Sequence, residues 1–508
     1  MRTAMRALSR SSRRGVRTGN ARQPLWRRWQ IPWRAPLALG ALGVIMLLLL
    51  NGELRTLPST ILERTLVAVA QVGLLTAFFH LTGLLRPTGL ALRSPIAYST
   101  RETGLILTGL VGGFSLLGVR AASLVGQGAT LHAELGYLAF APLIAGGMLL
   151  SVLIHPLLAL YTFAVLLCGV AVTLQLPIHT LAAVGLAGWS AILAIAPMRR
   201  RNHLFIAGAL LSGLLALTAF GVSFAGAWFD ALTSGLWGVA TGVGAVALFW
   251  LGLTLLERPF RLATPMTLME LASLEQPLLR ELRDKAPGTY FHSQQVGQLA
   301  EEAALAIGAD PLLARVAGYY HDIGKLSKPE FFIENQVGVD NLHAQINPTL
   351  SARIIAAHVR DGVELARQHR LPTAVRDIIA QHHGTTLITY FYYQAINGRH
   401  DPVLEQHFRY EGPKPQTREA AIVLLADSVE AASRVLGDVT PARLANFVRE
   451  MIEMRRQDGQ LDECNLTFRD LKLIEEAFVR VLVAARHRRI EYPSGDTAEE
   501  ESVYAVHP

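Results

Sequence analysis

The chain has 508 residues and a mean hydropathy of +0.32, with 51% hydrophobic but only 17% charged residues. Soluble domains carry about a quarter charged residues, so this composition argues against a purely soluble protein. The charge is uneven: residues 1–256 hold 19 Arg, no Lys and 5 acidic residues, whereas residues 257–508 hold 28 basic and 35 acidic residues. Because the basic excess lies beside apolar segments, we expect no nucleic-acid polymer as partner. The two cysteines exclude a disulfide framework.

Apolar stretches long enough to cross a bilayer as helices fill residues 36–256, so the lipid bilayer is an expected partner. We predict a polytopic transmembrane bundle of about eight spans, with approximate cores at 36–50, 65–85, 103–119, 135–154, 157–175, 178–197, 204–226 and 235–256. These cores contain no Asp, Glu, Lys or Arg. A signal-receiving or anchoring bundle is therefore favoured over a transporter.

The positions of Arg predict the orientation, because positively charged loops stay on the cytoplasmic side. The N-terminal segment, residues 1–35, carries ten Arg and no acidic residue, and we expect it to be cytoplasmic. Further Arg residues follow the second and the sixth spans: Arg86, Arg93, Arg101, Arg199, Arg200 and Arg201. We expect a multi-pass protein of the cell membrane with both termini in the cytoplasm. An organellar transit peptide is the alternative for the N-terminal segment.

The second half of the chain is polar, with helical periodicity and few strand signals. We predict a connecting helix and linker at 257–290, an all-helical cytoplasmic domain at 291–493 and an acidic disordered tail at 494–508. The whole chain is thus predicted to be all-α.

Seven His and Asp residues recur along this helical domain: His292, His321, Asp322, His358, His382, His383 and Asp427. Neutral imidazole and carboxylate together suit borderline divalent metals such as iron, manganese and zinc. Seven such groups are enough for two ions, and a carboxylate next to a His can bridge them. Paired cations generate a nucleophile from water at neutral pH and neutralise charge on a phosphate oxygen.

The order of these residues resembles that of the HD-domain metal-dependent phosphohydrolases. Longer stretches are similar to the seven-transmembrane-receptor HD phosphodiesterases, which hydrolyse cyclic di-AMP in second-messenger signalling. These stretches are Tyr319–Lys325, Pro329–Gln336, His358–Ala366, Gln381–Thr385, Phe391–Tyr393, Pro413–Gln416, Ala426–Ala431 and Asp458–Cys464. The resemblance covers residues 265–493 closely and the membrane bundle in arrangement, and it implies the inner membrane of a bacterium.

The resemblance also implies how the site is built. One metal ion would be held by His292, His321, Asp322 and Asp427, and a second by Asp322, His358, His382 and His383. Asp322 and Lys325 would be catalytic, with Lys325 also binding the substrate phosphates. The reaction would open cyclic di-AMP to linear pApA, with iron or manganese as the expected metal and zinc as the alternative. A homodimer is compatible with this arrangement.

The sequence departs from the family in one respect. Family members usually carry a large extracellular domain between the first span and the other seven, whereas only about residues 51–64 fill that place here. The bundle is therefore expected to anchor the enzyme or to receive signals within the membrane.

Several alternatives stay open at this stage. The substrate could be cyclic di-GMP, another nucleotide or an alarmone, although the Gly-Tyr-Pro loop of the cyclic di-GMP relatives is absent after His383, where Gly384 and Thr385 follow. A non-catalytic nucleotide-binding membrane receptor is a further alternative. His383 could be a structural partner, Lys325 a helix-end cation, and one ring of Tyr390–Tyr393 could either be core or stack on a base.

Overall fold

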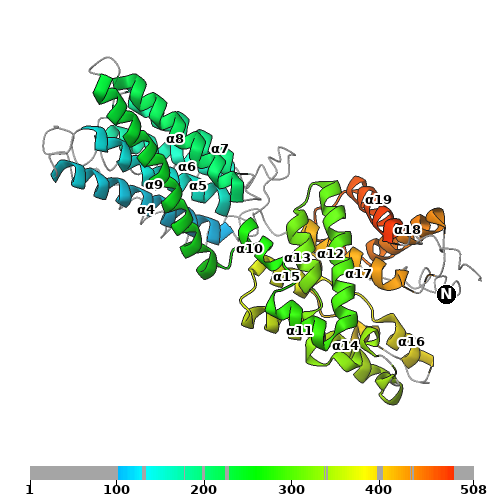
Figure 1. Cartoon of the computed structure of the whole chain (residues 1–508). Coiled ribbons are helices and arrows are strands. Elements are labelled where there is room, and N and C mark those ends of the chain that lie inside the picture. Colours follow the sequence, from blue (N-terminus) through cyan, green and yellow to red (C-terminus); the bar gives the residue numbers. More distant parts are fainter. Residues whose placement is uncertain are drawn as a thin grey trace, which may run out of the picture.

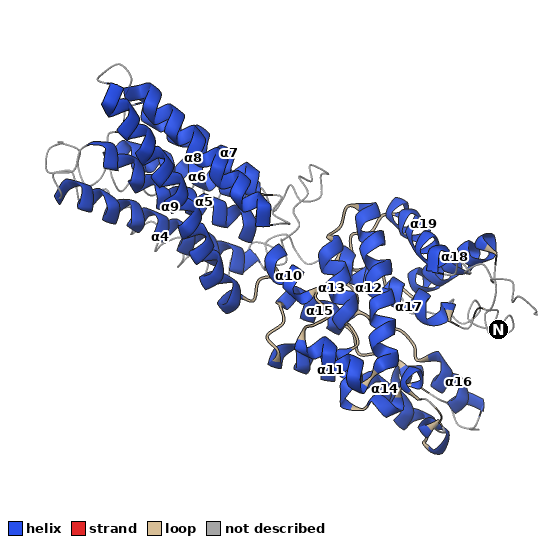
Figure 2. Ribbon diagram, viewed as in Figure 1, coloured by secondary structure: helices blue, strands red, loops and turns tan. Residues whose placement is uncertain are grey.

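The computed structural model describes residues 101–128, 133–174, 176, 178–196, 201–223, 228–336, 338, 341–397, 404–434, 436 and 440–485. Nearly every regular element in this part of the chain is a helix, which confirms the predicted all-α class (Figure 2). Only an isolated antiparallel bridge between Leu387 and Arg409 interrupts the pattern among the described residues. The first two predicted spans, the 51–64 loop, the N-terminal segment and the acidic tail lie outside the described residues.

Six apolar helices pack side by side as one elongated bundle, hereafter the apolar bundle (Figure 1). They are α4 (Arg101–Gly128), α5 (Ala141–Leu153), α6 (Pro156–Leu174), α7 (Ile178–Ile195), α8 (Arg201–Ser223) and α9 (Trp228–Phe260), with the 3-10 helix η2 (Ala133–Phe140) leading into α5. Each of the six predicted spans from residue 103 onward falls on one of these helices.

Only three of these helices are long and apolar enough to cross a membrane: α4, α8 and α9. The apolar helices at 137–153, 156–171 and 180–195 are shorter. Pro156 begins α6 shortly after the end of α5, so the chain turns before α5 reaches the length needed to cross a membrane. The predicted count of eight spans is therefore not confirmed.

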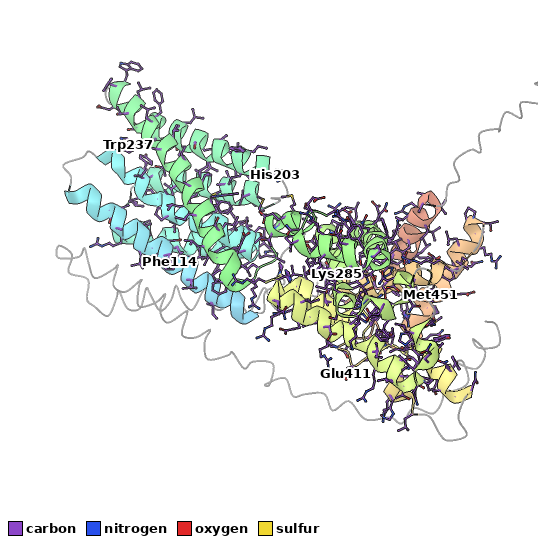
Figure 3. All side chains as sticks on the ribbon, turned by 60° about the horizontal axis from the view of Figure 1, so that its bottom comes forward. Phe114, His203, Trp237, Lys285, Glu411 and Met451 are labelled. Carbon is purple, nitrogen blue, oxygen red and sulfur yellow. The ribbon has the colours of Figure 1, made fainter. Side chains whose placement is uncertain are left out.

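The outward faces of the long helices are apolar. Only 22% of the apolar stretch of α8 and 28% of that of α9 are buried inside the protein. Phe114 on α4 and Leu217 on α8 are among the large exposed side chains, and Phe114 lies on the outside of the bundle in Figure 3. Such faces suit contact with lipid.

A short helix, α10 (Pro265–Leu271), joins the bundle to the rest of the chain (Figure 1). Thr264 caps it by accepting a hydrogen bond from the Thr267 N–H. Met266 packs into the core of the apolar bundle and Leu268 into the core of the following domain. The predicted connecting segment 257–290 thus holds the end of α9, α10, α11 (Pro277–Lys285) and the start of the next helix.

The remaining elements form one helical domain, hereafter the C-terminal domain. Its helices are α12 (Pro287–Ile307), α13 (Pro311–Tyr320), α14 (Pro348–Gln368), α15 (Thr373–Gln381), α16 (Thr389–Asn397), α17 (Arg418–Ser433), α18 (Pro441–Gln457) and α19 (Phe468–Ala485). Five 3-10 helices accompany them: η3 (Ile323–Ser327), η4 (Pro329–Phe331), η5 (Ile333–Asn335), η6 (Leu342–Gln345) and η7 (Glu405–Phe408).

Local sequence explains several of these boundaries. Pro287 and Pro311 stand at the first helical position, where proline's missing N–H costs nothing. Gly308 ends α12 in the left-handed conformation, and the Asp310 carboxylate caps α13 by accepting from the N–H groups of Leu312 and Leu313. Helix α17 is buried along most of its length, which places Asp427 inside the domain.

Candidate metal centre

The seven predicted ligands come from five separate segments of the C-terminal domain. His292 lies on α12, His358 on α14 and Asp427 on α17. The other four follow the ends of two helices, with His321 and Asp322 after α13, and His382 and His383 after α15. The structure brings all seven side chains together.

A close approach of two backbones makes this convergence feasible. Gly324, two residues after Asp322, lies directly against α14, where a Cβ atom would come within 1.9 Å of the carbonyl oxygen of His358. Only glycine fits such a contact. The backbone carrying Asp322 therefore lies against the helix that carries His358.

Asp322 lies at the centre of the cluster, and its two oxygens face different partners. Oδ2 lies 3.2 Å from His321 Nε2 and 3.6 Å from His292 Nε2. Oδ1 lies 3.2 Å from His358 Nε2 and 3.6 Å from His382 Nε2. A carboxylate in this position can bridge two ions, one on each side.

The ligand atoms fall into two groups, each small enough to surround one ion. One group comprises His292, His321 and Asp427, and the other comprises Asp322, His358, His382 and His383; within each group the ligand atoms lie within 4.8 Å of one another. Asp427 approaches both groups, because its Oδ1 lies 3.1 Å from His292 Nε2 and its Oδ2 lies 3.4 Å from His383 Nδ1.

The residues fit divalent metal ions. His321 Nε2 and Asp322 Oδ1 are buried and make no hydrogen bond in the described part of the chain. An unsatisfied buried polar group costs about 1–3 kcal/mol, so two of them at the centre of a His and Asp cluster fit a site that binds cations. Nitrogen and carboxylate donors of this kind suit iron, manganese and zinc.

Backbone carbonyls orient three of the imidazoles. Nδ1 of His321 donates to the Gly318 carbonyl at 2.8 Å, Nδ1 of His358 to that of Ile355 at 2.6 Å, and Nδ1 of His382 to that of Ile379 at 2.7 Å. A carbonyl only accepts, so the proton is assigned to Nδ1 and the Nε2 lone pair faces the centre.

Glu430 orients the fourth imidazole, and sequence analysis did not single it out. Its Oε2 lies 2.5 Å from His292 Nδ1, while Arg434 Nε donates to Oε1 at 2.8 Å. Glu430 stands three residues after Asp427 on the same helix, so the two side chains share one face. This spacing of three residues could have identified Glu430 from the sequence as a neighbour of Asp427.

Burial and neighbouring charges set the protonation states. Burial raises the pKa of Asp322, but His321 and Lys325 outweigh it and hold that pKa well below its ordinary value. Burial lowers the pKa of His292, but hydrogen bonds to Asp427 and Glu430 raise it to about 9.

The paired histidines respond differently. Burial lowers the pKa of His382, and burial together with the neighbouring His382 lowers the pKa of His383 well below its ordinary value. Both imidazoles are therefore neutral at pH 7, the form that binds metal ions.

Lys325 also lies at the cluster, in contact with two carboxylates. Its Nζ lies 2.7 Å from Asp322 Oδ2 and 2.7 Å from Glu334 Oε1. Burial lowers the pKa of Lys325, but these two carboxylates raise it above its ordinary value, so the side chain stays charged. Glu334 is a further partner that sequence analysis did not identify.

Aromatic rings do contact the cluster, but in the described part of the chain none of them comes from residues 390–393. Phe391 is buried and packs on the ring of His343, in a small separate core. Tyr410 instead stacks on His383, with ring centroids 4.2 Å apart and planes at 27°. No pattern around Tyr410 distinguished it in the sequence.

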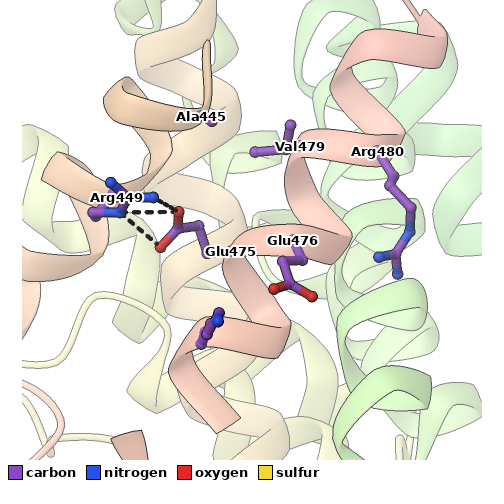
Figure 4. A pocket seen from close by; sticks show the side chains of 7 residues that line it. Ala445, Arg449, Glu475, Glu476, Val479 and Arg480 are labelled. Carbon is purple, nitrogen blue, oxygen red and sulfur yellow. Dashed lines mark hydrogen bonds and ion pairs between the residues drawn. The ribbon is translucent and has the colours of Figure 1, made fainter. Parts of the chain in front are cut away.

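A groove between α18 and α19 contains none of these residues (Figure 4). Charged side chains line it, and Arg449 forms an ion pair with Glu475 across it at 2.7 Å. It is therefore separate from the metal centre.

Comparison with known families supports the two-part organisation. The family model described as "7TM receptor with intracellular HD hydrolase" matches residues 70–264, and the HD domain model matches residues 289–432. The first model thus matches the apolar bundle together with residues before it, and the second matches most of the C-terminal domain. The match and the three long apolar helices identify a membrane protein with a C-terminal HD domain.

Among similar proteins, the cyclic-di-AMP phosphodiesterase PgpH of Bacillus subtilis is 45% identical over 258 residues, which are 51% of this chain and 36% of that protein. The Listeria monocytogenes protein of the same name is 41% identical over 290 residues, 57% of this chain and 38% of that protein. The alignments thus span well under half the length of these relatives.

A solved structure is also similar: the L. monocytogenes PgpH HD domain in complex with cyclic-di-AMP. The two sequences are 44% identical, and the alignment covers 43% of this chain and 100% of the chain in that structure. The TM-score is 0.41.

Proposed function

We propose that this chain is a membrane-anchored, two-metal phosphodiesterase that hydrolyses cyclic di-AMP to linear pApA in second-messenger signalling. The observation that carries the proposal is Asp322, whose two carboxylate oxygens face separate groups of buried imidazoles. The proposed substrate follows from the similarity to the two PgpH proteins, which are cyclic-di-AMP phosphodiesterases.

We assign the roles in metal and substrate binding to the following residues. His292, His321 and Asp427 would hold one ion, His358, His382 and His383 the other, and Asp322 would contact both. Two such ions, iron or manganese in our proposal, would supply a nucleophile from water and would stabilise charge on the phosphate. Lys325 keeps a positive charge beside Asp322, and we assign it to the substrate phosphate.

The domain organisation and the membrane topology belong to the same proposal. The bundle at 36–256 would anchor the enzyme in the bacterial inner membrane as a multi-pass protein with both termini in the cytoplasm. Residues 257–290 would connect it to the HD phosphohydrolase domain at 291–493, with a basic segment at 1–35 and an acidic tail at 494–508. A homodimer is the assembly that we would test first.

A substrate comparison tests the proposed function. The full chain, purified in detergent and loaded with Mn²⁺ or anaerobic Fe²⁺, is given cyclic di-AMP and cyclic di-GMP in parallel, with Asp427→Asn as the inactive control. We expect conversion of cyclic di-AMP to pApA that the control lacks. Faster turnover of cyclic di-GMP, or no turnover of either by a folded, metal-loaded chain, would reject the proposal.

A further inference from the structure

His383 differs from the other imidazoles of the cluster in how its ring is held. His321, His358 and His382 each donate Nδ1–H to a backbone carbonyl, and His292 is hydrogen-bonded to Glu430. The ring of His383 has no carbonyl partner in the described part of the chain, and its Nδ1 instead faces Asp427. Its side chain is also 21% exposed, more than that of any other predicted ligand. Something else must fix its orientation.

Of the three rings that contact His383, those of His382 and Tyr410 lie closer than that of His358. The ring of His382 lies 4.1 Å away, centroid to centroid, and the ring of Tyr410 lies 4.2 Å away. Tyr410 is attached to the same loop, because its N–H donates to the Thr386 carbonyl at 3.0 Å. The position of His383 therefore depends on the loop at 384–386 and on the segment that carries Tyr410.

Gln460 holds that loop from the other side. Its side chain is fully buried, its Oε1 accepts from the Thr385 N–H at 2.8 Å, and its Nε2 donates to Thr385 Oγ1 at 3.0 Å. Gly384 has a left-handed φ of 51°, and a Cβ atom there would lie 2.4 Å from Gln460 Oε1. The glycine both permits this turn and leaves room for the amide.

Asp458 ties Gln460 to the segment that carries Tyr410. The Gln460 amide donates to Asp458 Oδ2 at 2.9 Å. Arg409, the residue before Tyr410, donates to Asp458 Oδ1 at 2.9 Å through Nη2 and to the Thr385 carbonyl at 2.7 Å through Nη1. One buried amide thus joins both segments that enclose His383.

We propose that Gln460 is a positioning residue that fixes the loop at 384–386 and, through it, the His383 ring for the ion held with His358 and His382. The inference rests on the proposed two-metal centre and extends it to the 458–464 stretch, to which the proposed chemistry assigns no role. The direct hydrogen bonds of the Gln460 amide go to Thr385 and Asp458, so it acts on this loop rather than on the general core.

Metal affinity tests the inference independently of turnover. We would measure Mn²⁺ binding to the metal-free full chain in detergent, comparing wild type with Gln460→Leu. We expect one of the two ions to bind about 10- to 100-fold more weakly and the other to be unchanged, as when other outer partners of metal ligands are removed. The Mn²⁺ concentration for half-maximal hydrolysis should rise by the same factor, with the maximal rate recovered at saturating Mn²⁺.

Gln457→Leu is the matched control, because Gln457 is an exposed glutamine three residues earlier whose amide donates to Glu453 Oε1. It should leave both ions unaffected. If Gln460→Leu does not fold, Thr385→Val removes only the hydroxyl partner and should weaken the same ion to a smaller extent.

Two results would overturn the inference. One is wild-type affinity for both ions in folded Gln460→Leu, or in Thr385→Val where that variant has to replace it. The other is equal weakening of both ions together with a lower Tm of the metal-free chain, which indicates general destabilisation. A wild-type chain that binds two ions but hydrolyses no dinucleotide would reject the proposed function alone, because the binding comparison still decides the role of Gln460.

Discussion

The two halves of the chain are both helical, but they bury opposite kinds of side chain. Among the described residues of the apolar bundle, the buried polar groups are hydroxyls such as those of Thr108, Ser151 and Thr241. The HD domain buries imidazoles and carboxylates, with Asp322 and His382 almost completely enclosed. Burying charge is costly unless it is paired or coordinates a metal. The buried imidazoles and carboxylates therefore favour the HD domain as the place of the proposed metal centre.

The outer surfaces differ in the same way. Leu217 on α8 is 71% exposed and Leu305 on α12 is 59% exposed, yet we expect the first to face lipid and the second to face water. An exposed leucine on a helix is therefore expected to contact lipid in one half and water in the other. Substitutions can test whether that difference is real.

Metal removal should have the largest effect. Chelation of the purified chain should abolish hydrolysis of cyclic di-AMP, because the ions would supply the nucleophile and Lys325 alone cannot replace it, and Mn²⁺ should restore hydrolysis. The Tm should also fall, since an ion at 100 times its Kd stabilises the folded state by about 2.7 kcal/mol. Full activity after complete chelation, checked by elemental analysis, would contradict a metal centre in this half.

Matched substitutions of exposed leucines should separate the two surfaces. Leu217→Lys places a charge within an apolar span and should cost about 2.5–3.5 kcal/mol of insertion free energy. Leu305→Lys should change stability by no more than about 0.5 kcal/mol, as is usual for a water-exposed position. The measurement is the amount of folded chain recovered in the membrane fraction. Equal recovery of both variants would contradict the assignment of the α8 face to lipid.

Glu430→Gln should have a smaller, local effect. Glutamine has one acceptor oxygen for the two donors that Glu430 serves, His292 Nδ1 and Arg434 Nε, so the binding of one Mn²⁺ ion should weaken by about 10- to 100-fold. Glu419→Gln is the control on the same helix, because Glu419 is also buried but accepts from the Asp310 N–H, which an amide oxygen can replace. Unchanged Mn²⁺ affinity in Glu430→Gln would show that His292 needs no such partner.

Arg449→Ala should have the smallest effect. Its ion pair with Glu475 lies at an exposed groove away from the metal centre, and such pairs contribute little to stability (Figure 4). We expect no measurable change in Tm or in hydrolysis of cyclic di-AMP. A loss of hydrolysis would mean that this groove takes part in the reaction.

Much of the fold could be predicted from the sequence because its signals are local. Apolar runs predicted the helices of the bundle, and Pro287 and Gly308 stand where α12 begins and ends. The number of spans could not be settled in this way, because helix length also depends on where the chain turns. Pro156 and the short α5 show such a turn.

The seven candidate ligands could be grouped from the sequence, whereas the residues that support them could not. These seven residues follow the order of a known family, so the resemblance grouped them. Gln460 and Thr385 lie 75 positions apart, and His292 and Glu430 lie 138 apart. Contacts over such separations are decided by tertiary packing, and nothing in the local sequence around Tyr410 or Gln460 distinguishes them from surface residues.

The measurement that tests the central claim most directly compares wild type with Asp322→Ala for bound metal and for hydrolysis of cyclic di-AMP in the same samples. Asp284→Ala, at an exposed acidic residue on α11, is the control. We predict about two ions per chain and pApA from wild type and from the control, whereas Asp322→Ala should be folded but depleted of metal and without turnover. Near-normal turnover by folded Asp322→Ala would contradict the claim that this carboxylate joins two ions in one active site.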